Sequence, residues 1–361
     1  MFGVMETRTA LGAILAHKVS AEGRTFQKGH KLTWENLSFL GSSGISQVTA
    51  HRIEPDEVDE ENAADLVSRA IGAEHMRIAP AVGGRMNFYS QADGLFVADK
   101  KLVDIFNSID HAITFASLAD RISVKAGEMI ATVKIIPLAV SRSAVEAAAS
   151  VARIGCMIKV MPFRRQTVSL IATQLPSLSE KTMSKTARIL GGRLIERNSL
   201  LLSETRVAHS VEAVAAALNA EIETRPPSDH MIVIFGASAV VDKHDVIPEA
   251  IRLAGGVVER VGMPVDPGNL LVLGRVGDIP LIGAPGCARS SSENGLDWVL
   301  DRLIAGDHLD GLDISRMGVG GLLKEISARP QLREEPVRGA HFLERDEVSV
   351  IRHGIRTPQM G

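Results

Sequence analysis

Short apolar runs alternate with longer amphipathic segments from Thr167 onward. The run Met231–Phe235 has five apolar residues without interruption, as is typical of a strand buried on both faces of a parallel sheet. The same pattern predicts an α/β domain. Its other strands are expected at 167–173, 200–207, 257–261, 270–273 and 279–282, and its helices over 179–196, from about 210, from 248 and through 296–304. Residues 283–290 are expected to open the last helix, because Ser290 and Glu293 have capping-box spacing.

The first part of the chain has a different pattern. Residues 1–75 mix short strands and helices, including a helix after Thr33 as N-cap, and form a predicted α+β segment. Residues 76–158 are expected to form a small β-rich unit with a hairpin turning at Ala126-Gly127 and a linker helix over 141–158. The α/β domain is predicted over 159–310, with a C-terminal tail over 311–361.

Composition narrows the class of protein. With 361 residues, 45% of them hydrophobic, the chain can bury a large core, and a net charge of −3 gives no electrostatic reason to expect nucleic acid or a membrane partner. Cys156 and Cys287 have no metal-ligand or disulfide spacing, which fits a cytoplasmic protein. We find no signal peptide, and Arg153 and Lys159 interrupt the most apolar window.

Three loops of small residues follow strands of the predicted sheet, at 236–245, 262–269 and 283–290. The first begins Gly236-Ala237-Ser238-Ala239 and continues to Asp242 and Asp245. Backbone N–H groups in such loops can hold an anion, and acids can hold a metal or position a proton. Because ligands bind at the carboxyl ends of strands in open α/β sheets, we expect the loops to form one ligand site.

Two other charged segments are assigned to the surface. Six acids within 54–61 could indicate a metal site, but a solvated loop before the helix 63–71 is the favoured interpretation. Arg164 and Arg165 could hold a phosphate or carboxylate, and a surface pair is again favoured.

The three loops carry a family resemblance. Residues 236–239 (Gly-Ala-Ser-Ala) and 245–250 (Asp-Val-Ile-Pro-Glu-Ala) resemble the Gly-Gly-Thr-Gly and Arg-Asp-Val-Thr-Pro-Glu-Ala segments of molybdopterin-binding domains. Residues 263–268 (Met-Pro-Val-Asp-Pro-Gly) and 284–288 (Ala-Pro-Gly-Cys-Ala) resemble two later segments of the same domains. Residues 160–306 are therefore similar to the domain shared by molybdopterin adenylyltransferases and molybdenum insertases.

This resemblance implies a three-layer α/β/α fold and a role in molybdenum cofactor biosynthesis. It implies that Asp245, and less securely Asp242, serve catalysis and bind Mg²⁺, with ATP as a further ligand. The pterin phosphate would be held by small residues and backbone amides of the loops. These implied binding residues are Gly236, Ala237, Ser238, Ala239, Pro267, Gly268, Pro285, Gly286, Cys287, Arg289 and Ser290.

Departures from the family pattern leave the activity open. His209 stands where the adenylyltransferases have a catalytic acid, and Ala237 and Ala239 replace glycines. One hypothesis is a transferase-type step, either adenylyl transfer or molybdate insertion. The alternatives are a non-catalytic carrier that delivers the pterin to a nucleotidyltransferase or molybdoenzyme, and a structural protein whose site has decayed. Domains of this family often form homo-oligomers, which is expected here too.

Two side chains near the loops have competing interpretations. Cys287 could touch the dithiolene or a metal, with a helix start lowering the pKa of its thiol, but a space-filling buried role is favoured. His209 could be a general base, and a position capping the next helix is favoured.

Overall fold

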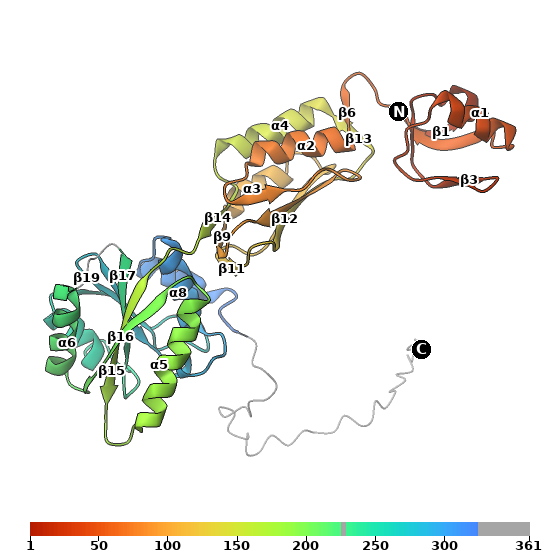
Figure 1. The fold of residues 1–361 in the computed structure, drawn as a ribbon. Helices are drawn as coiled ribbons and strands as arrows, with labels where there is room; N and C mark the ends of the chain where they lie inside the picture. The colour runs from red at the N-terminus through yellow and green to blue at the C-terminus, as the bar shows by residue number, and fades with distance from the viewer. Residues whose placement is uncertain (225–228, 324–361) are drawn as a thin grey trace, which may run out of the picture. The chain divides into compact units, whose positions relative to one another are not determined.

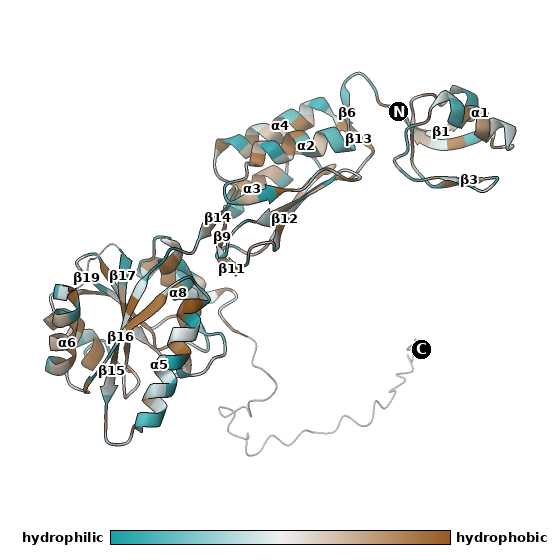
Figure 2. Cartoon of the chain, viewed as in Figure 1, coloured by the Kyte–Doolittle hydropathy of each residue, from teal (hydrophilic) through white to brown (hydrophobic). Residues whose placement is uncertain are grey.

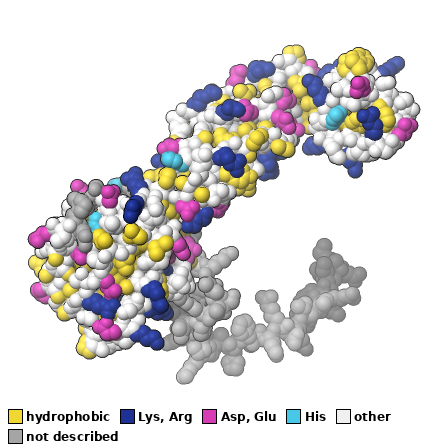
Figure 3. All heavy atoms as spheres, viewed as in Figure 1, with side chains coloured by type: hydrophobic (Ala, Val, Ile, Leu, Met, Phe, Trp, Pro, Cys, Tyr) yellow, Lys and Arg dark blue, Asp and Glu magenta, His cyan; other side chains and the backbone are white. Residues whose placement is uncertain are grey.

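The structure is a computed structural model that describes residues 1–224 and 229–323 (Figure 1). The proline-containing break at 225–228 and most of the expected C-terminal tail lie outside the described residues. Within the described part of the chain, no helix is long and apolar enough to cross a membrane. Lys and Arg side chains are interspersed with Asp and Glu over the visible face (Figure 3).

The N-terminal elements surround a small apolar core that includes Leu15, Leu32 and Leu40. Helix α1 (Trp34–Ser42) begins as expected, because the Thr33 side chain accepts the Asn36 N–H. A three-stranded antiparallel sheet has the order β1-β5-β2, and β3 pairs with β4. The strands are β1 (Phe2–Glu6), β2 (Ile14–Leu15), β3 (Val19–Ala21), β4 (Arg24–Phe26) and β5 (Gln47–His51), with a 3₁₀ turn at Thr7–Thr9.

A second core runs from Val58 to Val160 and includes α2 and α4. Asp59 caps α2 and accepts the Asn62 N–H, so acids do stand at the helix start as predicted. The expected solvated loop is wrong in part, because Glu57–Asp59 form strand β6 and the helix already begins at Glu60. Ser141 caps α4. The helices are α2 (Glu60–Ile71), α3 (Lys100–Asn107) and α4 (Arg142–Ile154). The strands are β6 (Glu57–Asp59), β7 (Met76–Ile78), β8 (Arg85–Ser90), β9 (Gly94–Ala98), β10 (Ile113–Ser117), β11 (Ile122–Val124), β12 (Met129–Ile135), β13 (Ala139–Ser141) and β14 (Ile158–Pro162).

The expected hairpin around Gly127 is wrong. Gly127 does form a turn with a φ of +87°, but the flanking strands belong to different sheets. Strand β11 pairs with β9, whereas β12 pairs with β10 and β8. The three sheets here have the orders β10-β12-β8-β7, β11-β9-β14 and β13-β6.

The α/β domain has a six-stranded sheet of order β16-β15-β17-β20-β19-β18. Strands β16, β15, β17 and β20 are parallel, and β19 is antiparallel to both of its neighbours. Two successive reversals therefore give β18 the same direction as β17 and β20. The strands are β15 (Thr167–Gln174), β16 (Leu200–Ala208), β17 (His230–Phe235), β18 (Val257–Val261), β19 (Val272–Val276) and β20 (Ile279–Ala284).

Helices cover both faces of this sheet, which confirms the α/β class and the three layers (Figures 1 and 2). Every residue of β17 is buried. Because side chains alternate along a strand, Val233 packs toward α5 and α8, whereas Ile232 and Ile234 pack toward α6 and α7. The helices are α5 (Glu180–Ile195), α6 (Val211–Thr224), α7 (Val246–Leu253) and α8 (Gly295–Ala305), followed by α9 (Gly311–Ser315).

Candidate functional site

The three small-residue loops lie at the same edge of the six-stranded sheet, as the sequence predicts. They follow β17, β18 and β20, which all run in one direction. Side chains and backbone join them directly. The Arg289 guanidinium of the third loop donates to the carbonyl oxygen of Gly236 in the first, at 2.8 Å. The Gly295 N–H at the start of α8 donates to Pro267 O in the second, at 2.9 Å.

The first loop turns sharply at Gly236. A Cβ at this position would lie 2.6 Å from the carbonyl oxygen of Ser238, so a larger residue does not fit. The Ala237 N–H donates to Thr173 Oγ1 at 2.6 Å and is therefore not available to a ligand. Ser238 and Ala239 are exposed, and their N–H groups have no partner among the described residues. These two amides can therefore donate to an anion.

The two acids of the first loop already accept backbone hydrogen bonds. Asp245 is the N-cap of α7, with Oδ1 accepting the Val246 N–H at 2.7 Å and Oδ2 accepting the Val241 N–H at 3.1 Å. Asp242 is exposed and accepts the His244 N–H at 2.8 Å. Helix α7 thus starts at Val246, before Pro248. The roles of Asp245 and Asp242 in catalysis and metal binding stay predictions.

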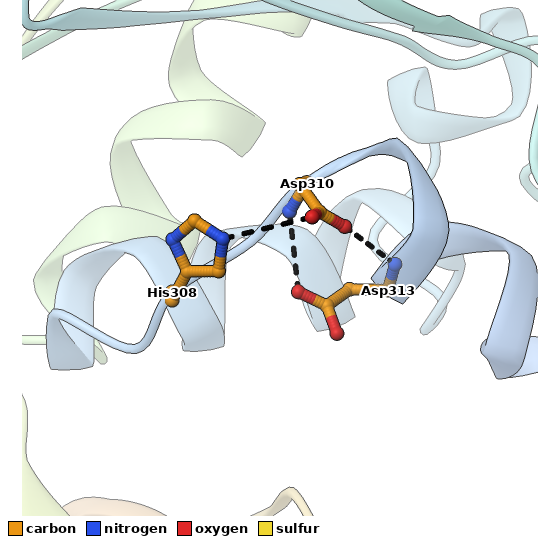
Figure 4. A group of neighbouring side chains, drawn as sticks. All are labelled: His308, Asp310 and Asp313. Carbon is orange, nitrogen blue, oxygen red and sulfur yellow. Dashed lines mark hydrogen bonds and ion pairs between the residues drawn. The ribbon is translucent and has the colours of Figure 1, made fainter.

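A group of three possible metal ligands occurs instead near the other end of α8, where His308, Asp310 and Asp313 lie together (Figure 4). Asp310 Oδ1 accepts the Asp313 N–H at 2.8 Å, and Asp313 Oδ2 accepts the Asp310 N–H at 3.3 Å. The first of these bonds is the main reason that the pKa of Asp310 is lowered. The two carboxylates therefore lie close because they form the capping box of α9.

The second loop packs against the start of α8. Gly268 has a φ of +147°, and a Cβ there would lie 2.7 Å from the Gly295 nitrogen. On its other side, the Asp266 N–H donates to Gly321 O at 2.8 Å, and the Leu323 N–H donates to Asp266 O at 2.9 Å. The loop that contains Pro267 and Gly268 is thus held between α8 and residues 321–323.

The third loop differs from the sequence prediction in where the last helix begins. Gly286–Arg289 forms a 3₁₀ turn, and α8 starts only at Gly295. The capping box is formed by Asn294 and Asp297, so the box expected from Ser290 and Glu293 is wrong.

Cys287 accordingly lies in the 3₁₀ turn that precedes α8 and is not a residue of the helix start. Burial raises the pKa of its half-buried thiol, so the lowered pKa expected from a helix start is wrong.

Arg289 is a half-buried cation at the edge of the sheet where the three loops lie. Its guanidinium donates to Gly236 O and to Thr186 Oγ1, at 2.8 and 2.9 Å, and its Cζ lies 5.3 Å from the centroid of the Phe235 ring. Burial lowers the pKa of Arg289. No carboxylate of a described residue forms an ion pair with it. Since a guanidinium has five N–H donors, Arg289 keeps donors for a ligand.

Arg193 of α5 holds the backbone on both sides of Arg289. This buried guanidinium donates to Ala288 O, Ser290 O and Ser292 O, at 2.9, 2.7 and 3.0 Å, and to Asp297 Oδ1 at 2.8 Å. The sequence prediction missed Arg193 and also Thr173. A signal existed for Arg193, because it occupies the helix side that also carries Leu190 and Leu194.

No model of a known protein family matches the sequence, and no curated protein matches it. Solved structures do match. A molybdopterin biosynthesis MoeA protein from Pyrococcus horikosii has a TM-score of 0.30 and 13% identity, over 69% of this chain and 79% of that one. Molybdenum cofactor biosynthesis protein B has a TM-score of 0.27 and 15% identity, over 40% and 91%.

A molybdenum cofactor biosynthesis protein from Pyrococcus furiosus has a TM-score of 0.24 and 10% identity, over 86% of this chain and 66% of that one. All three structures are described as proteins of molybdopterin or molybdenum cofactor biosynthesis.

Proposed function

We propose that the edge of the six-stranded sheet formed by the loops 236–245, 262–269 and 283–290, here called the ligand edge, binds the phosphate-bearing pterin of molybdopterin. This role would belong to molybdenum cofactor biosynthesis. The observation that carries this proposal is the position of Arg289. It is a half-buried cation that joins the first and third loops and has no carboxylate partner among the described residues. A buried guanidinium without a counterion is costly, and a bound phosphate would offset that cost.

The surroundings of Arg289 suit an anion. The unpartnered N–H groups of Ser238 and Ala239 belong to the loop whose Gly236 carbonyl Arg289 already contacts. Backbone amides and a guanidinium together recognise the oxygens of a phosphate monoester. The three loop motifs, in the order found in molybdopterin-binding domains, point to a pterin as the rest of the ligand.

Of the functions left open by the sequence, we favour a carrier over a transferase. Both oxygens of Asp245 accept backbone N–H bonds in the cap of α7, which is the work of a structural residue. Asp242 is exposed and bonded to its own loop. These acids fit a magnesium site poorly, so we derive no step that uses Mg²⁺ or ATP. A carrier would hand the pterin to a nucleotidyltransferase or molybdoenzyme.

The test is the pterin content of protein purified from a host that makes the cofactor. Acid and iodine release any bound pterin as its fluorescent oxidised form. We expect a stoichiometric signal in the wild type and in Arg188→Gln, a matched change of an exposed arginine on α5, and its loss in Arg289→Gln. A folded wild type that carries no pterin and binds none when it is added would refute the proposal.

The same protein separates carrier from enzyme. A carrier binds the pterin without consuming ATP in the presence of Mg²⁺. Pterin-dependent ATP turnover that disappears in Asp245→Asn would instead establish the transferase hypothesis.

A further inference from the structure

His209 lies directly beside the first loop, although it follows a different strand. Strand β16 pairs with β15 in parallel up to Ala208, and the His209 N–H donates to Gln174 O at 3.1 Å, just beyond that pairing. The ring of His209 is therefore held at the carboxyl end of β16, next to the end of β15.

A chain of two hydrogen bonds links this ring to the first loop. The fully buried Thr173 Oγ1 accepts the Ala237 N–H at 2.6 Å and lies 2.8 Å from His209 Nδ1. With the amide donating to its oxygen, the Thr173 hydroxyl has its own hydrogen to donate, and Nδ1 is the acceptor within reach. This pairing assigns the hydrogen of a neutral His209 to Nε2.

Nε2 of His209 is free for another contact. The ring is half-buried, and no described residue bonds to this nitrogen. The helix-capping role expected for His209 is wrong, because Ser210 Oγ accepts the Ala213 N–H at 3.3 Å and caps α6 itself. The only described side chain to which His209 bonds is thus Thr173, which also positions Ala237.

We propose that His209 is a further ligand-contacting residue, whose Nε2–H donates to an oxygen of the tetrahedral oxyanion bound at Ser238, Ala239 and Arg289. Thr173 is its positioning residue. This inference rests on the proposed function and extends it. The Thr173 hydroxyl bonds to both the backbone of the first loop and the imidazole of His209. It therefore fixes the position of the imidazole relative to the loop amides that would bind the ligand. The oxyanion is a phosphate monoester in the pterin, and molybdate has the same shape.

Two pairs of substitutions test the contact. His209→Asn keeps an acceptor for Thr173 near the position of Nδ1 but loses the outer donor, whereas His209→Gln can place an amide N–H near the position of Nε2. Thr173→Val removes the hydroxyl at nearly constant volume, whereas Thr173→Ser keeps it. Thr167→Val is the control, because Thr167 Oγ1 makes a similar 3.0 Å contact with His230 Nδ1 of β17 at the opposite end of β15.

The probes are inorganic phosphate and, separately, molybdate, titrated calorimetrically into the full-length protein. We expect His209→Asn and Thr173→Val to weaken binding about tenfold or more, the usual effect of losing one hydrogen bond to a charged group. His209→Gln should bind the oxyanion several-fold more tightly than His209→Asn, and Thr173→Ser several-fold more tightly than Thr173→Val. Thr167→Val should bind it as the wild type does. If His209→Asn and Thr173→Val weaken phosphate binding and molybdate does not bind, the site is assigned to the phosphate ester. If they weaken molybdate binding and phosphate does not bind, the site is assigned to molybdate.

Two results would overturn the inference, and they differ from failure of the proposed function. If His209→Asn binds both oxyanions as the wild type does while Arg289→Gln does not, His209 makes no contact but the site stands. If Thr167→Val weakens binding as much as Thr173→Val, the effect is a general one of sheet stability. A wild type that binds neither the oxyanions nor pterin would remove both proposals.

Discussion

The anchoring of the third loop by Arg193 yields a prediction with a close internal control. Arg193→Lys keeps the charge beside Asp297 but cannot reproduce the planar fork that bonds to Ala288 O, Ser290 O and Ser292 O. Arg197, one turn further along, is also buried and donates to Asp301, Asp297 and the Arg193 carbonyl, with no bond to the third loop. Arg197→Lys therefore disturbs the same network while leaving the loop anchored.

The magnitudes follow from the bonds that each change removes. Arg193 makes four hydrogen bonds and Arg197 makes three, nearly all within the buried network. A lysine can retain one or two of them, and each lost bond costs on the order of 1–1.5 kcal/mol. Arg193→Lys should therefore lose about 2–4 kcal/mol of unfolding free energy, and Arg197→Lys about 1–3 kcal/mol. Only Arg193→Lys frees the backbone around Arg289, so only it should weaken oxyanion binding, by roughly tenfold.

The assay pairs urea unfolding with phosphate titration at a temperature where all the proteins are folded. Stability losses in these two ranges, with a binding defect confined to Arg193→Lys, would support the reasoning. If both variants bind phosphate equally weakly, loss of stability rather than loop position controls the site. If Arg193→Lys binds phosphate as the wild type does, the hydrogen bonds from Arg193 to the third loop do not contribute to phosphate binding.

Three further predictions follow from the loops. Gly268→Ala should cost about 2–3 kcal/mol, since its Cβ would collide with Gly295, whereas Gly286→Ala, with open space around it, should stay within about 0.5 kcal/mol in chemical unfolding. Asp245→Asn should preserve the cap of α7, whereas Asp245→Ala should cost about 1 kcal/mol by the same measurement, and equal costs would contradict the capping role. Because burial raises the pKa of Cys287, less of its thiol is ionised at neutral pH than in a free cysteine, so iodoacetamide should label it slowly at pH 7 and faster as the pH rises. Labelling is followed by mass spectrometry of the peptide that contains Cys287, and rapid labelling at pH 7 would contradict a raised thiol pKa.

Local patterns predicted the sheet and its helices well. The uninterrupted run Met231–Phe235 became the fully buried β17, and Ser179 caps α5 where the apolar periodicity begins. Both features depend on residues close in sequence. The start of α8 was misplaced because Ser290 and Glu293 have the same spacing as the true capping box, and the spacing alone does not distinguish them.

The contacts that shape the site were beyond the sequence for a different reason. Thr173, His209 and Ala237 meet only because β15 lies between β16 and β17, an order that apolar periodicity does not specify. The partner of strand β11 could not be predicted for the same reason. Tertiary packing pairs it with β9, although the adjacent turn connects it to β12. Arg193 lies on an apolar helix side, but which backbone it holds depends on the path of the third loop.

The ligand edge joins residues that are far apart along the chain. The bond from Ala237 to Thr173 spans 64 positions, and the bond from Arg289 to Gly236 spans 53. Such contacts close large loops, so the ligand edge is complete only when the whole sheet is assembled. Binding then stabilises the native state alone, by about 2.7 kcal/mol when the free ligand is at 100 times its Kd. On the proposed function, the thermal midpoint of this protein should therefore track the supply of pterin, and the amount of folded protein in a cell would respond to it.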